Sequence, residues 1–253
     1  LLNAIRNPHE LYDEFFRIFA QMRFQREYGS RSDVMAEDWD YLFILDACRY
    51  DVFEETSWID GELNSIISKG SHSEEFCNAT CAGKTFYDTV YVTANAFGAR
   101  IGEGVFHDLI YTGQEINEEY VGWHSIAERM TAETVYNTAL DAIRDYPNKR
   151  VIVHFMQPHT PYFGEKAQEI RDRVEEEGLI VRSRQPEKVE KYSLDNDNVV
   201  VSLTEAAERG YVSESELMEV YIENLELVLE YVEKLVSQVN GKVVITADHG
   251  EHL

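Results

Sequence analysis

The sequence has few cysteines and few basic residues. Only three of its 253 residues are cysteine, a small and odd number that argues against a disulfide framework and favours a reducing compartment. Cys77 and Cys81 lie four residues apart, but no second ligand pair follows, so all three, with Cys48, are expected as buried thiols. The chain has 23 basic and 47 acidic residues, a formal net charge of −24. Nucleic acids and anionic lipid surfaces need a basic footprint, so neither is an expected partner.

Long apolar segments are also missing. No stretch approaches the roughly 18 consecutive apolar residues that a membrane span needs. No basic segment followed by an apolar run marks a signal peptide. The sequence therefore predicts no membrane span and favours a cytoplasmic location, although the first residue, Leu1, leaves room for an upstream segment.

Short apolar runs alternate with amphipathic segments, which predicts an α/β fold. The runs cover residues 41–45, 89–93, 150–156 and 242–246, and continuous apolar character is typical of strands buried on both faces. Helical periodicity lies between them, and its segments are residues 74–81, 131–146 and 214–239. This alternation predicts a mostly parallel central sheet that helices cover on both faces.

Two regions depart from this pattern. Residues 1–40 are expected to form an N-terminal helical segment, since apolar side chains recur at helical spacing between residues 10 and 28. Residues 41–253 then form the α/β domain. Within it, residues from about 164 to 212 are charged and irregular, which predicts an acidic insertion over one end of the sheet. This insertion is either a substrate lid or a solvated excursion.

Polar side chains follow the predicted strands, where open parallel sheets bind ligands. Asp46 and Asn95 end the first two runs, His159 follows the third, and Asp248 and His249 follow the fourth. A buried aspartate at a strand end is costly without a positive partner. The sequence therefore predicts a divalent cation facing Asp46, Asp248 and His249. Taken alone, Asp46 could instead cap the next helix, and the segment after the fourth run could be an ordinary turn.

Several ordered segments resemble the alkaline phosphatase and sulfatase superfamily. Residues 246–251, Thr-Ala-Asp-His-Gly-Glu, resemble the Asp-His-Gly-Glu signature of sulfatases and of phosphoethanolamine or lipoteichoic-acid-type transferases. Residues 43–51 resemble the family's opening strand, in which an Asp binds the metal and an Arg follows. Residues 155–162 are similar to the segment whose His contacts a phosphoryl or sulfuryl oxygen. The resemblance spans about residue 41 to the C-terminus and implies an alkaline phosphatase-like fold.

The resemblance implies a metal-dependent hydrolase or transferase that acts on phosphate or sulfate esters. One divalent ion would be bound by Asp46, Ser71, Asp248 and His249; the resemblance favours manganese or zinc and leaves calcium and magnesium as alternatives. Ser71 would be the nucleophile, because its segment matches the one that carries the threonine nucleophile of lipoteichoic-acid-type synthases. Ser73 is the alternative nucleophile, but we expect it to cap the helix that begins near residue 74.

The resemblance also assigns roles to His159 and Arg49. His159 would donate a proton to an oxygen of the transferring group or of the leaving group, with His72 as a weaker candidate. Arg49 would bind a substrate oxygen or else pair with Asp51. The expected substrate is a small-molecule, glycan or lipid-headgroup ester.

Departures from the family pattern narrow the expected enzyme class and the expected number of metal ions. Ser71 is not followed by the X-Pro-Ser-Arg signal, which disfavours a formylglycine sulfatase. Ala47 stands where sulfatases often have a second metal-binding Asp, and Phe155 stands four residues before His159, where two-metal phosphatases and mutases have an Asp. One metal is therefore the simplest account. A further His is expected in a C-terminal part of the fold that is missing after Leu253. The alternative function is a non-catalytic glycan- or partner-binding protein on this scaffold.

Overall fold

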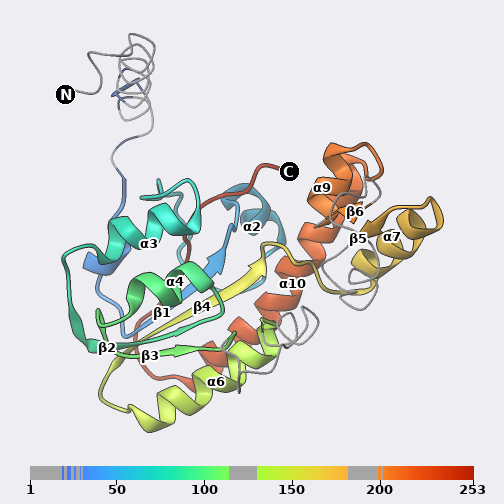
Figure 1. Cartoon of the computed structure of the whole chain (residues 1–253). Coiled ribbons are helices and arrows are strands. Elements are labelled where there is room, and N and C mark those ends of the chain that lie inside the picture. The colour runs from blue at the N-terminus through green and yellow to red at the C-terminus, as the bar shows by residue number, and fades with distance from the viewer. Residues whose placement is uncertain are drawn as a thin grey trace.

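The centre of the molecule is a parallel sheet of five strands in the order β3-β2-β4-β1-β7. The computed structural model describes residues 31–113, 130–181, 199–200 and 202–253, with a few single positions before residue 31. The strands are β1 (Tyr41–Asp46), β2 (Phe86–Thr93), β3 (Phe106–Tyr111), β4 (Arg150–Pro158) and β7 (Val243–Ala247). The α/β fold with a parallel sheet, predicted from the sequence, is confirmed (Figure 1).

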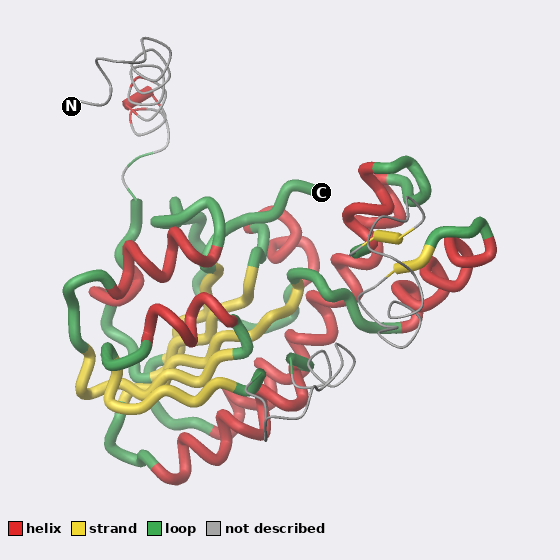
Figure 2. The backbone as a smooth tube through the Cα atoms, viewed as in Figure 1, coloured by secondary structure: helices red, strands yellow, loops and turns green. Residues whose placement is uncertain are grey.

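Helices cover both faces of this sheet (Figures 1 and 2). One face carries α3 (Ser73–Cys81) and α4 (Ala96–Gly102), and the other carries α2 (Tyr50–Thr56), α6 (Ala132–Asp145) and α10 (Glu214–Gln238). Side chains of β1 alternate between the two cores: Leu42 and Ile44 pack on the α3 side, and Phe43 and Leu45 pack on the α10 side. This strand is apolar without interruption because both of its faces are buried.

The longest helix, α10, has 25 residues and supports the face opposite α3. It begins with a capping box, in which the Ser213 hydroxyl accepts from the Glu216 N–H and the Glu216 carboxylate accepts from the Ser213 N–H. Its buried positions follow the helical spacing read from the sequence, from Leu217 through Leu225 to Leu235. This helix packs against β4, α6 and α2, so it can position residues at the end of the sheet.

The region predicted as an insertion leaves the central sheet. It contains α7 (Glu165–Glu176), β5 (Ile180–Val181), β6 (Val199–Val200) and α9 (Leu203–Glu208), and β5 and β6 pair as a second, two-stranded parallel sheet. The helices α7 and α9 contact α10 and lie beyond one end of the main sheet (Figure 1). A role as a substrate lid stays a prediction.

Some predictions fall outside the structural description, and some elements were not predicted. The expected N-terminal helix between residues 10 and 28 lies almost wholly outside the described residues. No helix in the described part of the chain is long and apolar enough to cross a membrane.

The strand β3 was not predicted. It has no apolar run, because it is an edge strand that contains His107 and Asp108 and is only partly buried after Phe106. The three cysteines are free and buried, as expected.

Candidate metal centre

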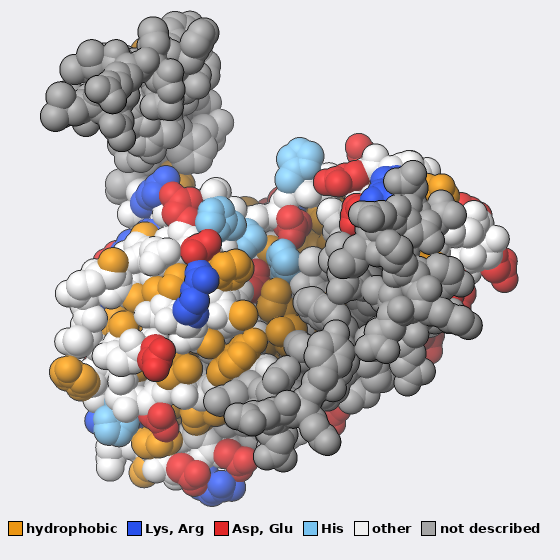
Figure 3. All heavy atoms as spheres, viewed as in Figure 1, with side chains coloured by type: hydrophobic (Ala, Val, Ile, Leu, Met, Phe, Trp, Pro, Cys, Tyr) orange, Lys and Arg blue, Asp and Glu red, His pale blue; other side chains and the backbone are white. Residues whose placement is uncertain are grey.

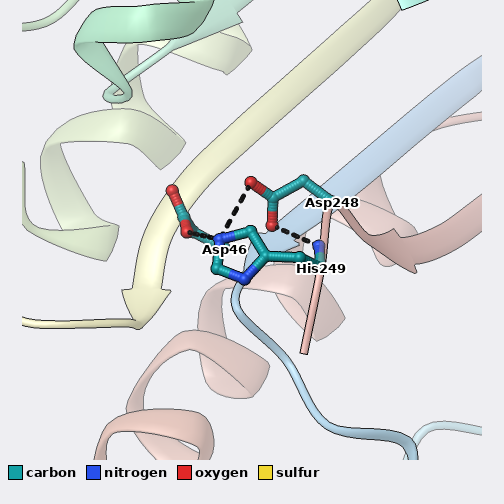
Figure 4. Close-up of side chains that lie close together, drawn as sticks. All are labelled: Asp46, Asp248 and His249. Atoms are coloured by element: carbon teal, nitrogen blue, oxygen red, sulfur yellow. Dashed lines mark hydrogen bonds and ion pairs between the residues drawn. The ribbon is translucent and has the colours of Figure 1, made fainter. Parts of the chain in front are cut away.

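Two aspartates meet at the carboxyl edge of the sheet. Asp46 is the last residue of β1, and Asp248 directly follows the neighbouring strand β7. Because these strands pair in parallel, with Leu45 opposite Ala247, both aspartates reach the same edge. Both side chains are 0% exposed. Asp46, Asp248 and His249 therefore form a buried group that could hold a metal ion, with ligand atoms within 4.8 Å of one another (Figure 4).

The His249 ring faces both carboxylates through Nε2 (Figure 4). This atom lies 3.4 Å from Asp46 Oδ1 and 3.6 Å from Asp248 Oδ2. On the other side of the ring, Nδ1 lies 2.7 Å from the Gly250 carbonyl oxygen, which can only accept, so Nδ1 donates. A neutral ring held in this way presents the Nε2 lone pair to the carboxylates. A carbonyl behind the imidazole is the usual support of a metal-binding histidine.

One oxygen of Asp248 lacks a partner. Its Oδ1 accepts from the Ala47 N–H at 3.0 Å and from the His249 N–H at 2.9 Å. Its Oδ2 is buried and has no hydrogen bond within the part of the chain that the structure describes. A buried polar atom without a partner costs about 1–3 kcal/mol, and more when it is charged. A cation between Asp248 and His249 would supply this partner, so the residues fit a bound metal ion.

A strained turn after β1 leaves the Asp46 carboxylate free to face Asp248 and His249. Ala47 has a positive φ of 58°, which an L-residue adopts at a cost of about 1–2 kcal/mol. The Tyr221 hydroxyl of α10 stabilises the turn by donating to the Ala47 carbonyl at 2.8 Å and accepting from the Arg49 N–H at 2.9 Å. The next helix, α2, has Arg49 as its N-cap. Asp46 therefore does not cap that helix.

Ser73, and not Ser71, lies beside the buried group. Ser73 is the first residue of α3, and its Oγ lies 3.4 Å from both Asp46 carboxylate oxygens and 3.4 Å from His249 Nε2. Ser71 is exposed, and its N–H and hydroxyl both donate to Glu75 Oε2, at 2.9 and 3.0 Å. The placement of Ser71 among the metal ligands is therefore corrected: the structure brings Ser73 to this position.

The N-cap of α3 explains why Ser73, and not Ser71, lies beside the buried group. We expected Ser73 to be the cap, but His72 caps this helix, and its Nδ1 accepts from the Glu75 N–H at 3.4 Å. Ser73 therefore begins the helix itself and is buried. The preceding loop lies tightly against the helix, since a Cβ at Gly70 would come within 2.3 Å of the Phe76 nitrogen. This close approach fixes which serine faces the sheet.

His159 lies at the rim of the group. Its ring meets the His249 ring edge to face, with centroids 6.2 Å apart. Its Nε2 is 3.6 Å from Glu251 Oε2, and its side chain is 28% exposed. Its backbone N–H donates to the Asp46 carbonyl oxygen at 3.2 Å, which ties the loop after β4 to the end of β1. The structure thus places His159 where it can meet a ligand, and histidine and acidic side chains gather on this face (Figure 3).

Arg49 takes the alternative role that the sequence left open. Its guanidinium pairs with Asp51, with Nε 3.0 Å from Oδ1. Arg49 and His249 also line one cavity of about 470 Å³, together with the apolar side chains of Leu63 and Ile66. Arg49 and the metal group thus border the same cavity, although the guanidinium is paired with Asp51.

Two further polar residues contact Asp46. Asn95, which follows β2 by two residues, donates through Nδ2 to Asp46 Oδ2 at 2.6 Å and caps α4 with its oxygen. His154 was not predicted. It is 0% exposed, and its Nε2 lies 3.7 Å from Asp46 Oδ2 and 3.8 Å from Asp248 Oδ2. The available signal was a single histidine inside an otherwise apolar strand, opposite Ile44 of β1.

The buried charges shift one another's pKa values. Burial raises the pKa of Asp248, and the negative charge of Asp46 raises it further. Burial would also raise the pKa of Asp46, but the hydrogen bond and positive charge of His249 hold it below its ordinary value. Burial favours neutral His249, yet Asp46 and Asp248 raise its pKa to about 9. Without a cation the proton on His249 is the positive partner of the aspartates, and a metal ion would replace it.

No protein-family model, curated protein or solved structure matches the chain. The resemblance to the alkaline phosphatase and sulfatase superfamily stays a prediction. The geometry around Asp46 is therefore the basis for assigning a function.

Proposed function

We propose that the protein is a metal-dependent hydrolase or transferase that acts on phosphate or sulfate esters through Ser73. The observation that carries this proposal is the position of Ser73 Oγ, 3.4 Å from both Asp46 and His249, beside the orphaned oxygen of Asp248. A serine hydroxyl next to a divalent ion is an activated nucleophile. The neighbouring ligand atoms are 3.4–3.6 Å apart, which matches the edge of about 3.4 Å in a tetrahedron with metal–ligand bonds of about 2.1 Å.

The ligands favour a particular kind of ion. Asp46, Asp248 and His249 would bind a divalent cation, which lowers the pKa of a nearby hydroxyl and offsets negative charge on a transferring group. A mixture of carboxylate oxygen and imidazole nitrogen suits zinc better than calcium or magnesium, which prefer oxygen, while manganese accepts the two carboxylates. Such a site also provides the local positive charge that an anionic ester needs on a chain with a net charge of −24.

The first step joins Ser73 to the substrate. Ser73 lies at the N-terminus of α3, where the helix dipole favours a negatively charged oxygen and an incoming anion. Its Oγ forms a bond to the phosphorus or sulfur atom as the bond to the leaving oxygen breaks. The serine proton passes to solvent, because the metal would lower the pKa of the hydroxyl, and the leaving oxygen keeps the electron pair and takes a proton from His159.

The second step releases the group. Water or an acceptor alcohol gives its proton to His159 and attacks the phosphorus or sulfur atom. The bond to Ser73 Oγ then breaks, and Oγ recovers a proton from solvent. Water as acceptor gives a hydrolase, and an alcohol gives a transferase. The partly apolar cavity that contains Leu63 and Ile66 would hold the remainder of a small-molecule, glycan or lipid-headgroup ester.

A pair of serine variants tests this function. Ser73→Ala and its matched control Ser71→Ala are loaded with zinc or manganese and assayed against phosphate and sulfate monoesters and diesters. We expect Ser73→Ala to keep its metal and lose turnover, while Ser71→Ala stays close to the wild-type rate. Loss of turnover in Ser71→Ala alone would overturn the assignment of Ser73. Metal binding without turnover of any ester by the wild type would instead favour the non-catalytic glycan- or partner-binding alternative.

A further inference from the structure

His154 lies under the metal group, in the middle of β4. It is fully buried, and its Nε2 has no hydrogen-bond partner among the residues that the structure describes. The same atom points between the two aspartates, 3.7 Å from Asp46 Oδ2 and 3.8 Å from Asp248 Oδ2. Asp248 Oδ2 is the other orphaned atom of this group. Two buried atoms that both lack a partner therefore face each other across one small gap.

The other side of the His154 ring is firmly held. Its Nδ1 lies 2.7 Å from the hydroxyl oxygen of Tyr91, and the two rings are stacked with centroids 6.1 Å apart. When the hydroxyl accepts from Nδ1–H, Nε2 presents a lone pair to the carboxylates. This arrangement matches His249, whose Nδ1 donates to a carbonyl while Nε2 faces Asp46 and Asp248. An outer partner that fixes the ring is typical of metal-binding histidines.

The distances favour a shared ion over a direct hydrogen bond. A hydrogen bond between an imidazole N–H and a carboxylate is about 2.7–2.9 Å long, and Nε2 is nearly 1 Å farther than that from both aspartates. The near-equal separations of 3.7 and 3.8 Å are instead close to the ligand–ligand spacing around one small cation. A lone pair facing two buried carboxylates is repulsive until a positive charge separates them.

We propose that His154 is a second histidine ligand of the metal centre, binding the ion from the sheet side, opposite the approach of substrate. This inference rests on the metal-binding part of the proposed function. The ligands are then two carboxylates and two imidazoles, from Asp46, Asp248, His249 and His154. His154 would move closer to the other three on metal binding, because the ligand atoms that lie within 4.8 Å of one another in this structure are those of Asp46, Asp248 and His249. Two nitrogen ligands shift the preference further towards zinc and other transition metals and away from calcium and magnesium.

The number of histidine nitrogens on the ion tests the proposal directly. Wild type, His154→Gln and His249→Gln are each loaded with one equivalent of copper(II), and pulsed electron paramagnetic resonance counts the coordinated imidazoles. We expect two in the wild type and one in each variant. We also expect zinc to bind His154→Gln at least about ten- to a hundredfold more weakly, since loss of even an outer-shell partner has an effect of that size.

Tyr91→Phe keeps a ring in the core and removes only the hydroxyl that orients His154, so it serves if His154→Gln fails to fold. We expect this variant to bind zinc about ten- to a hundredfold more weakly. One imidazole in the wild type, together with unchanged zinc affinity in His154→Gln and Tyr91→Phe, would overturn the role of His154 and leave the metal centre in place. A wild type that takes up no metal after reconstitution would overturn both proposals.

Discussion

The Tyr221 hydroxyl, on α10, donates a hydrogen bond to the carbonyl oxygen of Ala47, in the turn that follows β1. The same hydroxyl oxygen accepts the Arg49 N–H, so one side chain satisfies both ends of a turn with a positive φ. The Ala47 N–H in turn donates to Asp248. Through Tyr221, α10 thus stabilises the turn whose Ala47 N–H donates to Asp248.

Replacing Tyr221 by phenylalanine should loosen this turn. The variant leaves the Ala47 carbonyl and the Arg49 N–H without their partner, and a lost buried hydrogen bond costs about 1–3 kcal/mol. We expect the free energy of unfolding to fall by that amount in urea titrations, and zinc to bind more weakly. Tyr231→Phe, on the same helix about three turns away, is the matched control. Equal losses of metal affinity in both variants would contradict the role of Tyr221.

Asp248→Asn should leave the metal-free protein at least as stable as the wild type and should remove the stabilisation that zinc gives. Burial and the charge of Asp46 raise the Asp248 pKa, so removing its charge relieves a repulsion in the metal-free protein. We expect the metal-free variant to melt no lower than the metal-free wild type. Zinc at about 100 times Kd stabilises the wild type by about 2.7 kcal/mol, and this gain should be lost in the variant. Scanning calorimetry measures both effects, and a zinc-induced rise in the Tm of the variant would count against Asp248 as a ligand.

Metal affinity should rise with pH. The His249 pKa is raised in the folded protein from 6.5 to about 9, so the proton stabilises the metal-free fold fully below pH 6.5 and this stability is lost as pH rises towards 9. A metal ion must displace that proton, so we expect affinity to increase by about tenfold per pH unit between these values. Calorimetric titration of manganese in buffers of different ionisation enthalpy counts the released protons. Affinity that does not change with pH would contradict this coupling.

The capping box of α10 offers a change in stability that leaves the site intact. Ser213→Ala removes the hydroxyl that accepts from the Glu216 N–H, and loss of such a cap costs about 1 kcal/mol. We expect a lower urea midpoint with unchanged zinc affinity, because the cap lies away from the metal group. A parallel loss of affinity would show that general stability, rather than local geometry, governs metal binding, and would weaken the interpretation of the Tyr221 variant.

The part of the site that could be predicted is the part set by strand ends. Asp46 and Asp248 each follow a continuous apolar run, and parallel strands bring such residues to one edge whatever lies between them. The buried group of Asp46, Asp248 and His249 therefore follows from the order of residues along the chain. The central strands and helix α10 can likewise be predicted from the sequence. A strand buried on both faces is a continuous apolar run, whereas a helix buried along one stripe has apolar residues every three to four positions.

The part that could not be predicted depends on tertiary contacts. Which of three successive residues caps α3 depends on how the preceding loop lies against the helix. Gly70 lies close to Phe76, His72 is the cap and Ser73 is buried. His154 lies in a strand buried on both faces, where no alternation marks which face a residue joins. The edge strand β3 is only partly buried, so its sequence shows neither the continuous apolar run of a buried strand nor the spacing of an amphipathic helix.

The bond from the Ala47 N–H to Asp248 joins positions 201 residues apart. Closing so long a loop carries a large entropic penalty, and contacts of this kind slow folding. The two carboxylates therefore become neighbours only when the last central strand has added beside β1. A nascent chain that lacks this strand has no paired aspartates to offer an ion. Under the proposed function, uptake of the metal reports that β7 has paired with β1.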